Sequence, residues 1–103
     1  MCALELLVPD RGVAALVDGR QVALFRTTPD DALYALSNYD PFSGANVLSR
    51  GIVGSRGDAP KVASPMYKQS FDLRTGVCLD DAAVAVEVFP VRVVDGVVQV
   101  AIR

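Results

Sequence analysis

Short apolar segments separated by turn residues follow one another along almost the whole chain. Two pairs of these segments are each joined by Asp-Gly, once at Asp18-Gly19 and once at Asp95-Gly96. Asp-Gly favours a two-residue turn between antiparallel strands, because both central residues of that turn need a positive φ. The pattern therefore predicts a β-hairpin near each end of the sequence. The strands expected beside the two turns are residues 13–17 and 22–25, and residues 91–94 and 97–102.

Shorter apolar segments predict further strands between the two hairpins. In the segment that contains Phe71, Asp72 and Leu73, the alternation places the two apolar side chains inward and the aspartate outward. No window of ten or more residues keeps a 3.6-residue period, so no long helix is expected. Many short strands with frequent turns are typical of a small all-β barrel or sandwich. The additional strands are expected at residues 33–36, 61–63, 70–73 and 84–88.

Residues 40–60 differ from the rest of the chain, since they hold four glycines and two prolines. Glycine and proline at this density favour turns and irregular structure. We therefore expect a long loop here, and long loops in compact domains usually carry a function. The apolar side chains that can anchor it are Phe42, Val47, Leu48, Ile52 and Val53.

The composition is that of one globular domain covering residues 1–103. Hydrophobic residues make up 51% of the chain, charged residues make up 21%, and the net charge is −2. This balance gives no basic surface for nucleic acid, and no apolar run approaches the roughly 18 residues of a membrane span. The first residues lack the basic start and cleavage site of a secretion signal, so a cytoplasmic protein is expected. Cys2 and Cys78 have no metal-binding spacing, and Cys78 is expected to pack as a small apolar side chain.

Two segments carry a more specific pattern. Residues 64–67, Ser-Pro-Met-Tyr, are followed at residues 71–76 by Phe-Asp-Leu-Arg-Thr-Gly. Together they resemble the second cluster-binding loop of a Rieske iron–sulfur domain, which begins Cys-Pro-x-His and continues with Phe-Asp-x-x-Thr-Gly. The first loop of such a domain follows a strand and contains Cys-x-His, and here Asn38 and Asp40 stand at those two positions.

The resemblance implies a Rieske-like fold in which the iron ligands have been replaced. A Rieske centre needs two cysteines on one iron and two histidines on the other, and this chain has no histidine. The polar groups at the four positions can instead hydrogen-bond across the site and hold the two loops together. A hard cation held by Asn38, Asp40 and Asp58 is an alternative, although Asx turns account for these residues better. The four positions that match the ligands are Asn38, Asp40, Ser64 and Tyr67.

Three segments give a narrower resemblance. Residues 40–45, 48–54 and 64–71 resemble the small subunits of assimilatory NAD(P)H-dependent nitrite reductases, and the similarity extends over residues 12–103. It implies an accessory subunit of a cytoplasmic oxidoreductase that reduces nitrite to ammonium in nitrate assimilation. In that enzyme the large subunit, which this chain would dock on, carries FAD, sirohaem and a [4Fe–4S] cluster. The chain itself is expected to carry no cofactor or metal and not to be catalytic alone.

The tips of the two loops face partners in cluster-bearing relatives. If they keep that position here, they form an apolar surface with polar edges, and tyrosine and methionine are enriched at protein interfaces. Packing within the loops is the alternative for these side chains, and an anion such as nitrite is an alternative neighbour for the lysine. A cluster-free interaction module for another oxidoreductase or a regulatory complex is the alternative function. The expected interface residues are Tyr39, Phe42, Met66, Tyr67 and Lys68.

Overall fold

The computed structural model describes residues 2–3, 7–27, 32–66 and 68–101. In these ranges β-strands account for almost all regular structure, together with a single three-residue 3₁₀ turn, and no helix there could cross a membrane. The all-β fold class is therefore confirmed. The elements are β1 (Cys2–Ala3), β2 (Arg11–Val17), β3 (Arg20–Thr27), β4 (Ala32–Ser37), β5 (Tyr39–Asp40), β6 (Ala45–Asn46), the 3₁₀ turn η2 (Leu48–Arg50), β7 (Ile52–Arg56), β8 (Ala59–Ala63), β9 (Ser70–Asp72), β10 (Val88–Phe89), β11 (Val91–Val94) and β12 (Val97–Val100).

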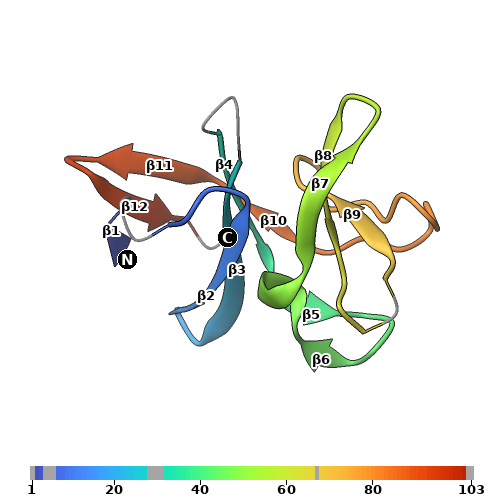
Figure 1. Cartoon of the computed structure of the whole chain (residues 1–103). Coiled ribbons are helices and arrows are strands. Elements are labelled where there is room, and N and C mark those ends of the chain that lie inside the picture. The colour runs from blue at the N-terminus through green and yellow to red at the C-terminus, as the bar shows by residue number, and fades with distance from the viewer. Residues whose placement is uncertain (1, 4–6, 28–31, 67, 102–103) are drawn as a thin grey trace.

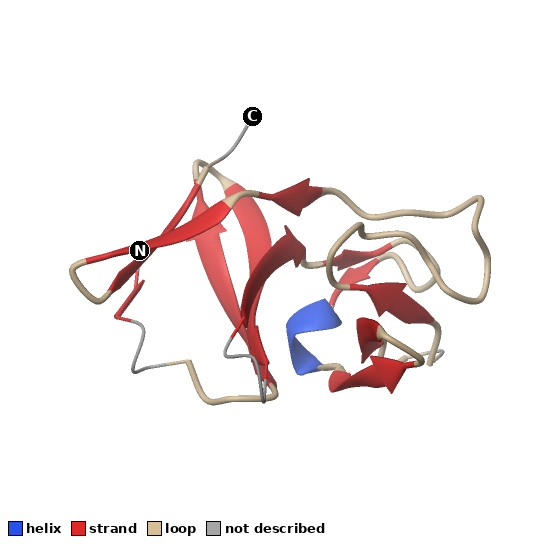
Figure 2. Ribbon diagram, turned by 90° about the horizontal axis from the view of Figure 1, so that it is seen from above, coloured by secondary structure: helices blue, strands red, loops and turns tan. Residues whose placement is uncertain are grey.

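The strands form antiparallel sheets that sit side by side (Figure 1). The central sheet has the order β10-β4-β3-β2 and is flanked on one side by the terminal sheet, β1-β12-β11. On its other side lie the distal sheet, β7-β8-β9, and the short hairpin β5-β6. The turn η2 lies between the long strands of the central sheet and these smaller strands (Figure 2).

The strand β3 is covered on both faces because the central sheet separates two hydrophobic cores. Successive side chains of a strand point to opposite faces. On β3, Val22 and Leu24 therefore pack in the core shared with the terminal sheet, whereas Phe25 packs in the core shared with the distal sheet. A strand covered on both sides needs a nearly continuous apolar sequence, and Val22–Phe25 has one. The distal core, which lies beneath the two loops, comprises Ala23, Phe25, Leu36, Leu48, Val62, Phe71, Leu73, Cys78 and Val86.

Both predicted hairpins are confirmed. The first turn has φ of 49° at Asp18 and 80° at Gly19, and the second has 51° at Asp95 and 75° at Gly96. Two successive positive φ values are the signature of the type I′ turn, whose twist matches that of the strands it joins. The expected segments 33–36 and 61–63 are also strands, as parts of β4 and β8.

The prediction of a long loop over residues 40–60 is wrong for most of that segment. It contains the end of β5, then β6, η2, β7 and the start of β8. Arg56 pairs with Ala59 across the two-residue turn Gly57-Asp58, and φ at Gly57 is 60°. Glycine at the first central position of a two-residue turn is itself a hairpin signal. This hairpin signal was outweighed in the sequence pattern because the flanking strands also contain Gly54 and Pro60, and both residue types are unusual within strands.

Two smaller expectations are also wrong. The strand predicted over residues 84–88 is reduced to β10, and Ala85 forms only an isolated bridge with Val77. Asp72 was expected to point outward, yet it is buried. It stays charged there because its carboxylate Oδ2 lies 3.2 Å from Nη2 of Arg74 and its Oδ1 accepts the Arg74 backbone N–H at 2.8 Å.

Candidate functional site

The two loops singled out by the sequence lie against each other beside the distal core. The first, residues 38–47, leads from β4 to η2 and includes β5 and β6; the second, residues 64–69, joins β8 to β9. Asn38, Asp40 and Ser64 are polar, yet each is almost completely buried. Buried polar groups are stable only when hydrogen-bonded. The partners of these three side chains therefore define what the site does.

Asp40 and Ser64 bind each other directly across the two loops. The hydroxyl of Ser64 donates to Oδ2 of Asp40. The other carboxylate oxygen, Oδ1, accepts the N–H of Phe42 at 2.9 Å, and Oγ of Ser64 accepts the N–H of Met66 at 3.3 Å. The link thus joins not only the loops but also the backbone of both tips. The resemblance to a Rieske site predicts such a connection, with polar side chains at the replaced iron-ligand positions hydrogen-bonding across the site.

Asn38 fixes the base of the first loop. Its Oδ1 accepts the N–H of Ser49 at 2.7 Å, and its Nδ2 lies 3.3 Å from Oε1 of Gln21 and 3.2 Å from the carbonyl oxygen of Asn46. One side chain therefore connects β3, β6 and η2. No sequence pattern identifies Gln21 or Ser49 as partners, because the two residues lie 17 and 11 positions away from Asn38.

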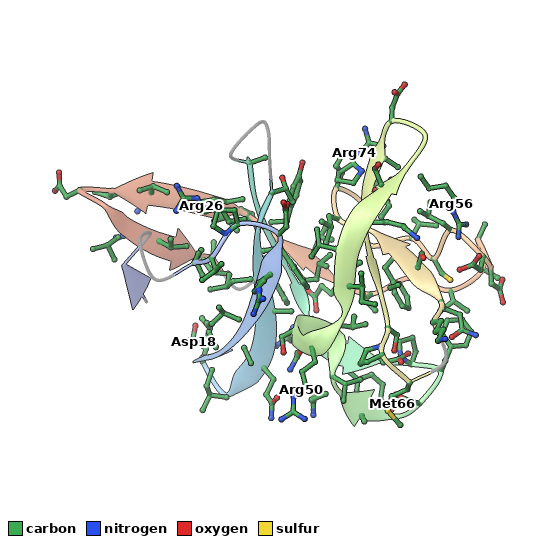
Figure 3. All side chains as sticks on the ribbon, in the orientation of Figure 1. Asp18, Arg26, Arg50, Arg56, Met66 and Arg74 are labelled. Carbon is green, nitrogen blue, oxygen red and sulfur yellow. The ribbon has the colours of Figure 1, made fainter. Side chains whose placement is uncertain are left out.

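The expected interface residues fall into two groups. Tyr39 is 46% exposed and Met66 is 54% exposed, and Lys68 is exposed beside them in the second loop. In Figure 3 the side chain of Met66 points away from the fold at the loop end of the molecule. Phe42 instead is partly buried, with its ring centroid 6.1 Å from that of Phe71 in the distal core. Tyr67 lies outside the described residues.

The donor set does not fit a [2Fe–2S] cluster. Such a cluster needs thiolates and, in the Rieske type, imidazoles. Asn38, Asp40 and Ser64 offer only an amide, a carboxylate and a hydroxyl, and all three already have protein partners. Cys78 is buried in the distal core as a free thiol, as expected of a small apolar side chain. In the described part of the chain, no three His, Cys, Asp or Glu residues are grouped as a metal site would require.

The carboxylates near the second loop have structural roles. Burial alone would raise the pKa of Asp72, but hydrogen bonds from the side chain and backbone of Arg74 outweigh it and hold the pKa below the usual value. The N–H of Ser70 donates to Oδ2 of Asp80 at 2.8 Å and is the main reason that the pKa of Asp80 is lowered. Asp80 also pairs with Arg56 at 3.1 Å. These contacts fasten the strand that follows the loop.

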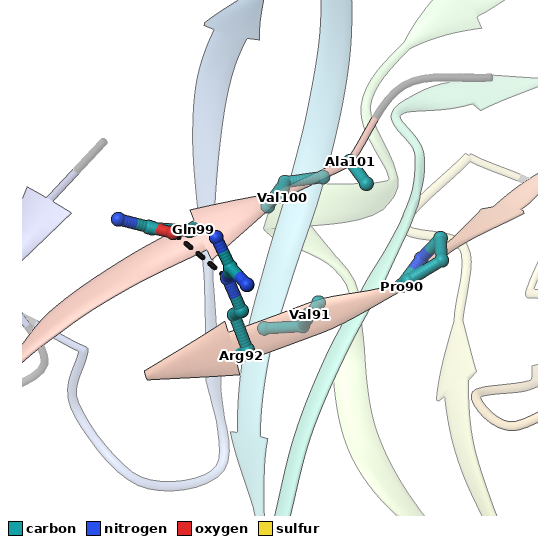
Figure 4. Close-up of a pocket in the computed structure, with 6 residues that line it drawn as sticks. All are labelled: Pro90, Val91, Arg92, Gln99, Val100 and Ala101. Atoms are coloured by element: carbon teal, nitrogen blue, oxygen red, sulfur yellow. Dashed lines mark hydrogen bonds between the residues drawn. The ribbon is translucent and has the colours of Figure 1, made fainter. Parts of the chain in front are cut away.

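A surface hollow away from the loops lies between the start of β11 and the end of β12 (Figure 4). It has a volume of about 410 Å³ and contains none of the expected site residues. Its one charged side chain, Arg92, donates from Nε to Oε1 of Gln99 at 2.9 Å. The lining is otherwise mostly apolar and offers no group for catalysis or metal binding.

Comparison with known proteins agrees with the fold. The family described as the Rieske-like [2Fe-2S] domain matches residues 1–101, which places the chain in that class of domain. The nitrite reductase (NADH) small subunit of Salmonella typhimurium is 44% identical over 99 residues, covering 96% of this chain and 92% of that protein. A crystal structure described as an NADH-dependent nitrite reductase small subunit of Mycobacterium tuberculosis has a TM-score of 0.93 and 54% identity, covering 97% of this chain and 89% of that one.

One relative has a different organisation. A region of the nitrite reductase [NAD(P)H] large subunit of Klebsiella oxytoca is 45% identical over 100 residues, which is 97% of this chain but 10% of that protein. The chain described here belongs to the family of small subunits of NAD(P)H-dependent nitrite reductases. The family expected from the sequence is therefore confirmed.

Proposed function

We propose that this chain is the cluster-free docking subunit of a cytoplasmic NAD(P)H-dependent nitrite reductase. The observation that carries the proposal is the Klebsiella oxytoca protein, in which nearly the whole of this domain is matched within a polypeptide named as the large subunit. A domain that occurs both as a separate subunit and within the larger chain is expected to work in contact with it. On this proposal residues 1–103 are one Rieske-like domain, and the large subunit carries the FAD, sirohaem and [4Fe–4S] cluster that reduce nitrite to ammonium.

The chemistry of the loops supports docking rather than electron transfer. The side chains at Asn38, Asp40 and Ser64 have no redox chemistry, and they hydrogen-bond to protein groups. Holding two loops together removes conformational freedom before binding, so less is lost when the complex forms. The chain would act by ordering or shielding the large subunit at the surface it contacts.

The contact surface that we propose is formed by Tyr39, Phe42, Met66, Tyr67 and Lys68. Tyr39 and Met66 are the exposed apolar members, and both belong to residue types enriched at interfaces. Phe42 contributes from beneath, where it packs on Phe71 and supports the first tip. The Asp40–Ser64 link fixes the two tips relative to each other through the backbone of Phe42 and Met66.

The test is the affinity of the Tyr39→Ala/Met66→Ala variant for the purified large subunit. Truncating two anchoring side chains of an interface should weaken binding by about tenfold or more, with the fold unchanged. Val94→Ala is the matched control, because Val94 is similarly exposed but lies on the terminal sheet. A folded double variant that binds as tightly as the control would rule out the loop tips as the docking surface. Wild-type protein that does not bind the large subunit at all would overturn the docking function itself.

A further inference from the structure

Strand β2 is apolar on both faces, although the fold covers only one of them. The sequence of residues 12–17 is Gly-Val-Ala-Ala-Leu-Val. The alternate residues Ala14 and Leu16 are exposed, and the exposed fraction of Leu16 is 73%. A nearly continuous apolar sequence is typical of a strand covered on both faces, whereas a strand with one face in solvent alternates apolar and polar residues. The residues of β2 that pack in the core shared with the terminal sheet are Val13, Ala15 and Val17.

The uncovered side chains project from the face of the central sheet that carries the two loops. A Cβ at Gly12 would collide with the carbonyl oxygen of Ser49, so Gly12 faces η2. Because side chains alternate along a strand, Ala14 and Leu16 project from this same face. The turn η2 therefore packs over the start of the face at Gly12, and the end of the face beside the first hairpin turn is left open.

Leu16 is connected to the base of the first loop through its cross-strand neighbour. It pairs in register with Gln21 on β3, and directly opposite residues project from the same face. Nδ2 of Asn38 donates to Oε1 of Gln21 at 3.3 Å, and the Asn38 N–H donates to the backbone carbonyl of Gln21 at 3.0 Å. Tyr39, an exposed member of the proposed contact surface, directly follows Asn38. The open face of β2 thus continues the surface formed by the first loop.

The end of β2 and the loop tips also lie at one end of the molecule. In Figure 3, Asp18 in the turn after β2, Arg50 of η2 and Met66 of the second loop all lie at this end, with Arg50 between the other two. A partner that approaches from this side can contact the hairpin, η2 and the loop tips together.

We propose that an apolar surface of the nitrite reductase large subunit covers the face formed by Ala14 and Leu16. The inference rests on the proposed docking function and adds an anchor outside the two loops. The large subunit is the expected occupant because the face continues the loop surface, and because the Klebsiella oxytoca large subunit includes a region that matches nearly this whole domain. Removal of the exposed leucine from water favours association. Contacts at the loops and at β2 together fix the orientation of the partner.

The experiment measures the affinity of the complete Leu16→Ser chain for the purified large subunit. Loss of a large apolar anchor should weaken binding by about tenfold. Because the contact is apolar, the loss should not shrink between about 0.05 M and 1 M NaCl, where charge contacts are screened. Leu16→Met keeps a large apolar side chain and should bind within about threefold of the wild type. Val94→Ser is the matched control, since it places the same polar residue at an exposed valine on the terminal sheet.

Hydrogen exchange gives a second measurement that needs no substitution. β2 is an outer strand of the central sheet, so its outward backbone groups have no neighbouring strand. When the large subunit covers this region, the amide hydrogens of residues 12–17 should exchange more slowly than in the free chain. Unchanged exchange of these amides in the complex would overturn the proposal.

The outcomes separate this contact from the docking function. Wild-type affinity in Leu16→Ser, with weakened binding in Tyr39→Ala/Met66→Ala, would overturn the β2 contact and leave docking intact. Failure of the wild-type chain to bind would overturn both. A wild-type chain that dimerises in sedimentation, and a Leu16→Ser chain that does not, would assign the face to a second copy and so contradict the proposal. Thermal unfolding checks the fold, and the exposed position of Leu16 predicts an almost unchanged midpoint.

Discussion

Removing the hydroxyl of Ser64 tests whether the link between the two loops holds the site together. Ser64→Ala takes the donor from Oδ2 of Asp40, while Oδ1 keeps the N–H of Phe42. Asp40 is 0% exposed, so water does not reach the vacated oxygen without rearrangement of the loops. A hydrogen bond to a charged group contributes about 1.5–3 kcal/mol, and an unpartnered buried acceptor carries its own desolvation penalty. We therefore expect the free energy of unfolding to fall by about 2–3 kcal/mol.

The assay is urea denaturation, followed by thermal unfolding. For a domain of this size 1 kcal/mol corresponds to about 4–8 °C, so the midpoint should fall by roughly 10–20 °C. Ser55→Ala is the matched control, because Ser55 is exposed on β7, and it should change stability by less than about 0.5 kcal/mol. A cycle with Asp40→Ala should give a coupling energy of about 1–3 kcal/mol between the two residues. A loss below about 0.5 kcal/mol in Ser64→Ala, or no coupling in the cycle, would refute the reasoning.

Three further substitutions test other parts of the structure. Gly12→Ala should lower the free energy of unfolding in urea by about 2–4 kcal/mol, because its Cβ would overlap the η2 backbone. Gly54→Ala is the control, since a Cβ there lies 3.8 Å from its nearest neighbour, and it should change stability by no more than about 1 kcal/mol. Equal effects of the two substitutions would contradict this. Asn38→Ala should lower the free energy of unfolding by about 2–4 kcal/mol in the same assay, since it removes three side-chain hydrogen bonds. A loss of less than about 1 kcal/mol would contradict the role of Asn38 in fixing the first loop. Asp72 has a lowered pKa, so its stabilisation is present above the unfolded value of 3.8 and is lost as the pH falls through the lower folded value. Asp72→Asn should therefore reduce stability at pH 7 and flatten its decline in acid, measured by unfolding from pH 7 to about 2, and an unchanged profile would contradict the pairing with Arg74.

Much of the fold could be predicted from local sequence. Asp18-Gly19 and Asp95-Gly96 each specify a turn that only a hairpin accommodates, and the structure has both. The alternation of Phe71 and Leu73 also identified core positions correctly. These features depend on backbone conformations and periodicities that a few neighbouring residues determine.

What could not be predicted depends on contacts between distant segments. Gly54 in β7 and Pro60 in β8 argued against strands, but pairing of β7 with β8 and of β8 with β9, and burial of Val62 in the distal core, outweighed those local preferences. Asp72 was expected outside because nothing in a strand pattern indicates that Arg74, two residues on, folds back to pair with it.

The site was predicted in part for the same reason. The motif gave the positions of Asn38, Asp40 and Ser64, but the sequence did not show which of them pair.

The central claim is that this chain supports nitrite reduction by contact and not through a cluster of its own. The most direct test is nitrite-dependent NAD(P)H oxidation by the purified large subunit, titrated with this chain, together with iron analysis of the chain alone. The account predicts a saturable gain in activity with no iron bound to this chain. Full activity without the chain and no binding between the two, or a stoichiometric iron–sulfur cluster in the chain, would contradict it.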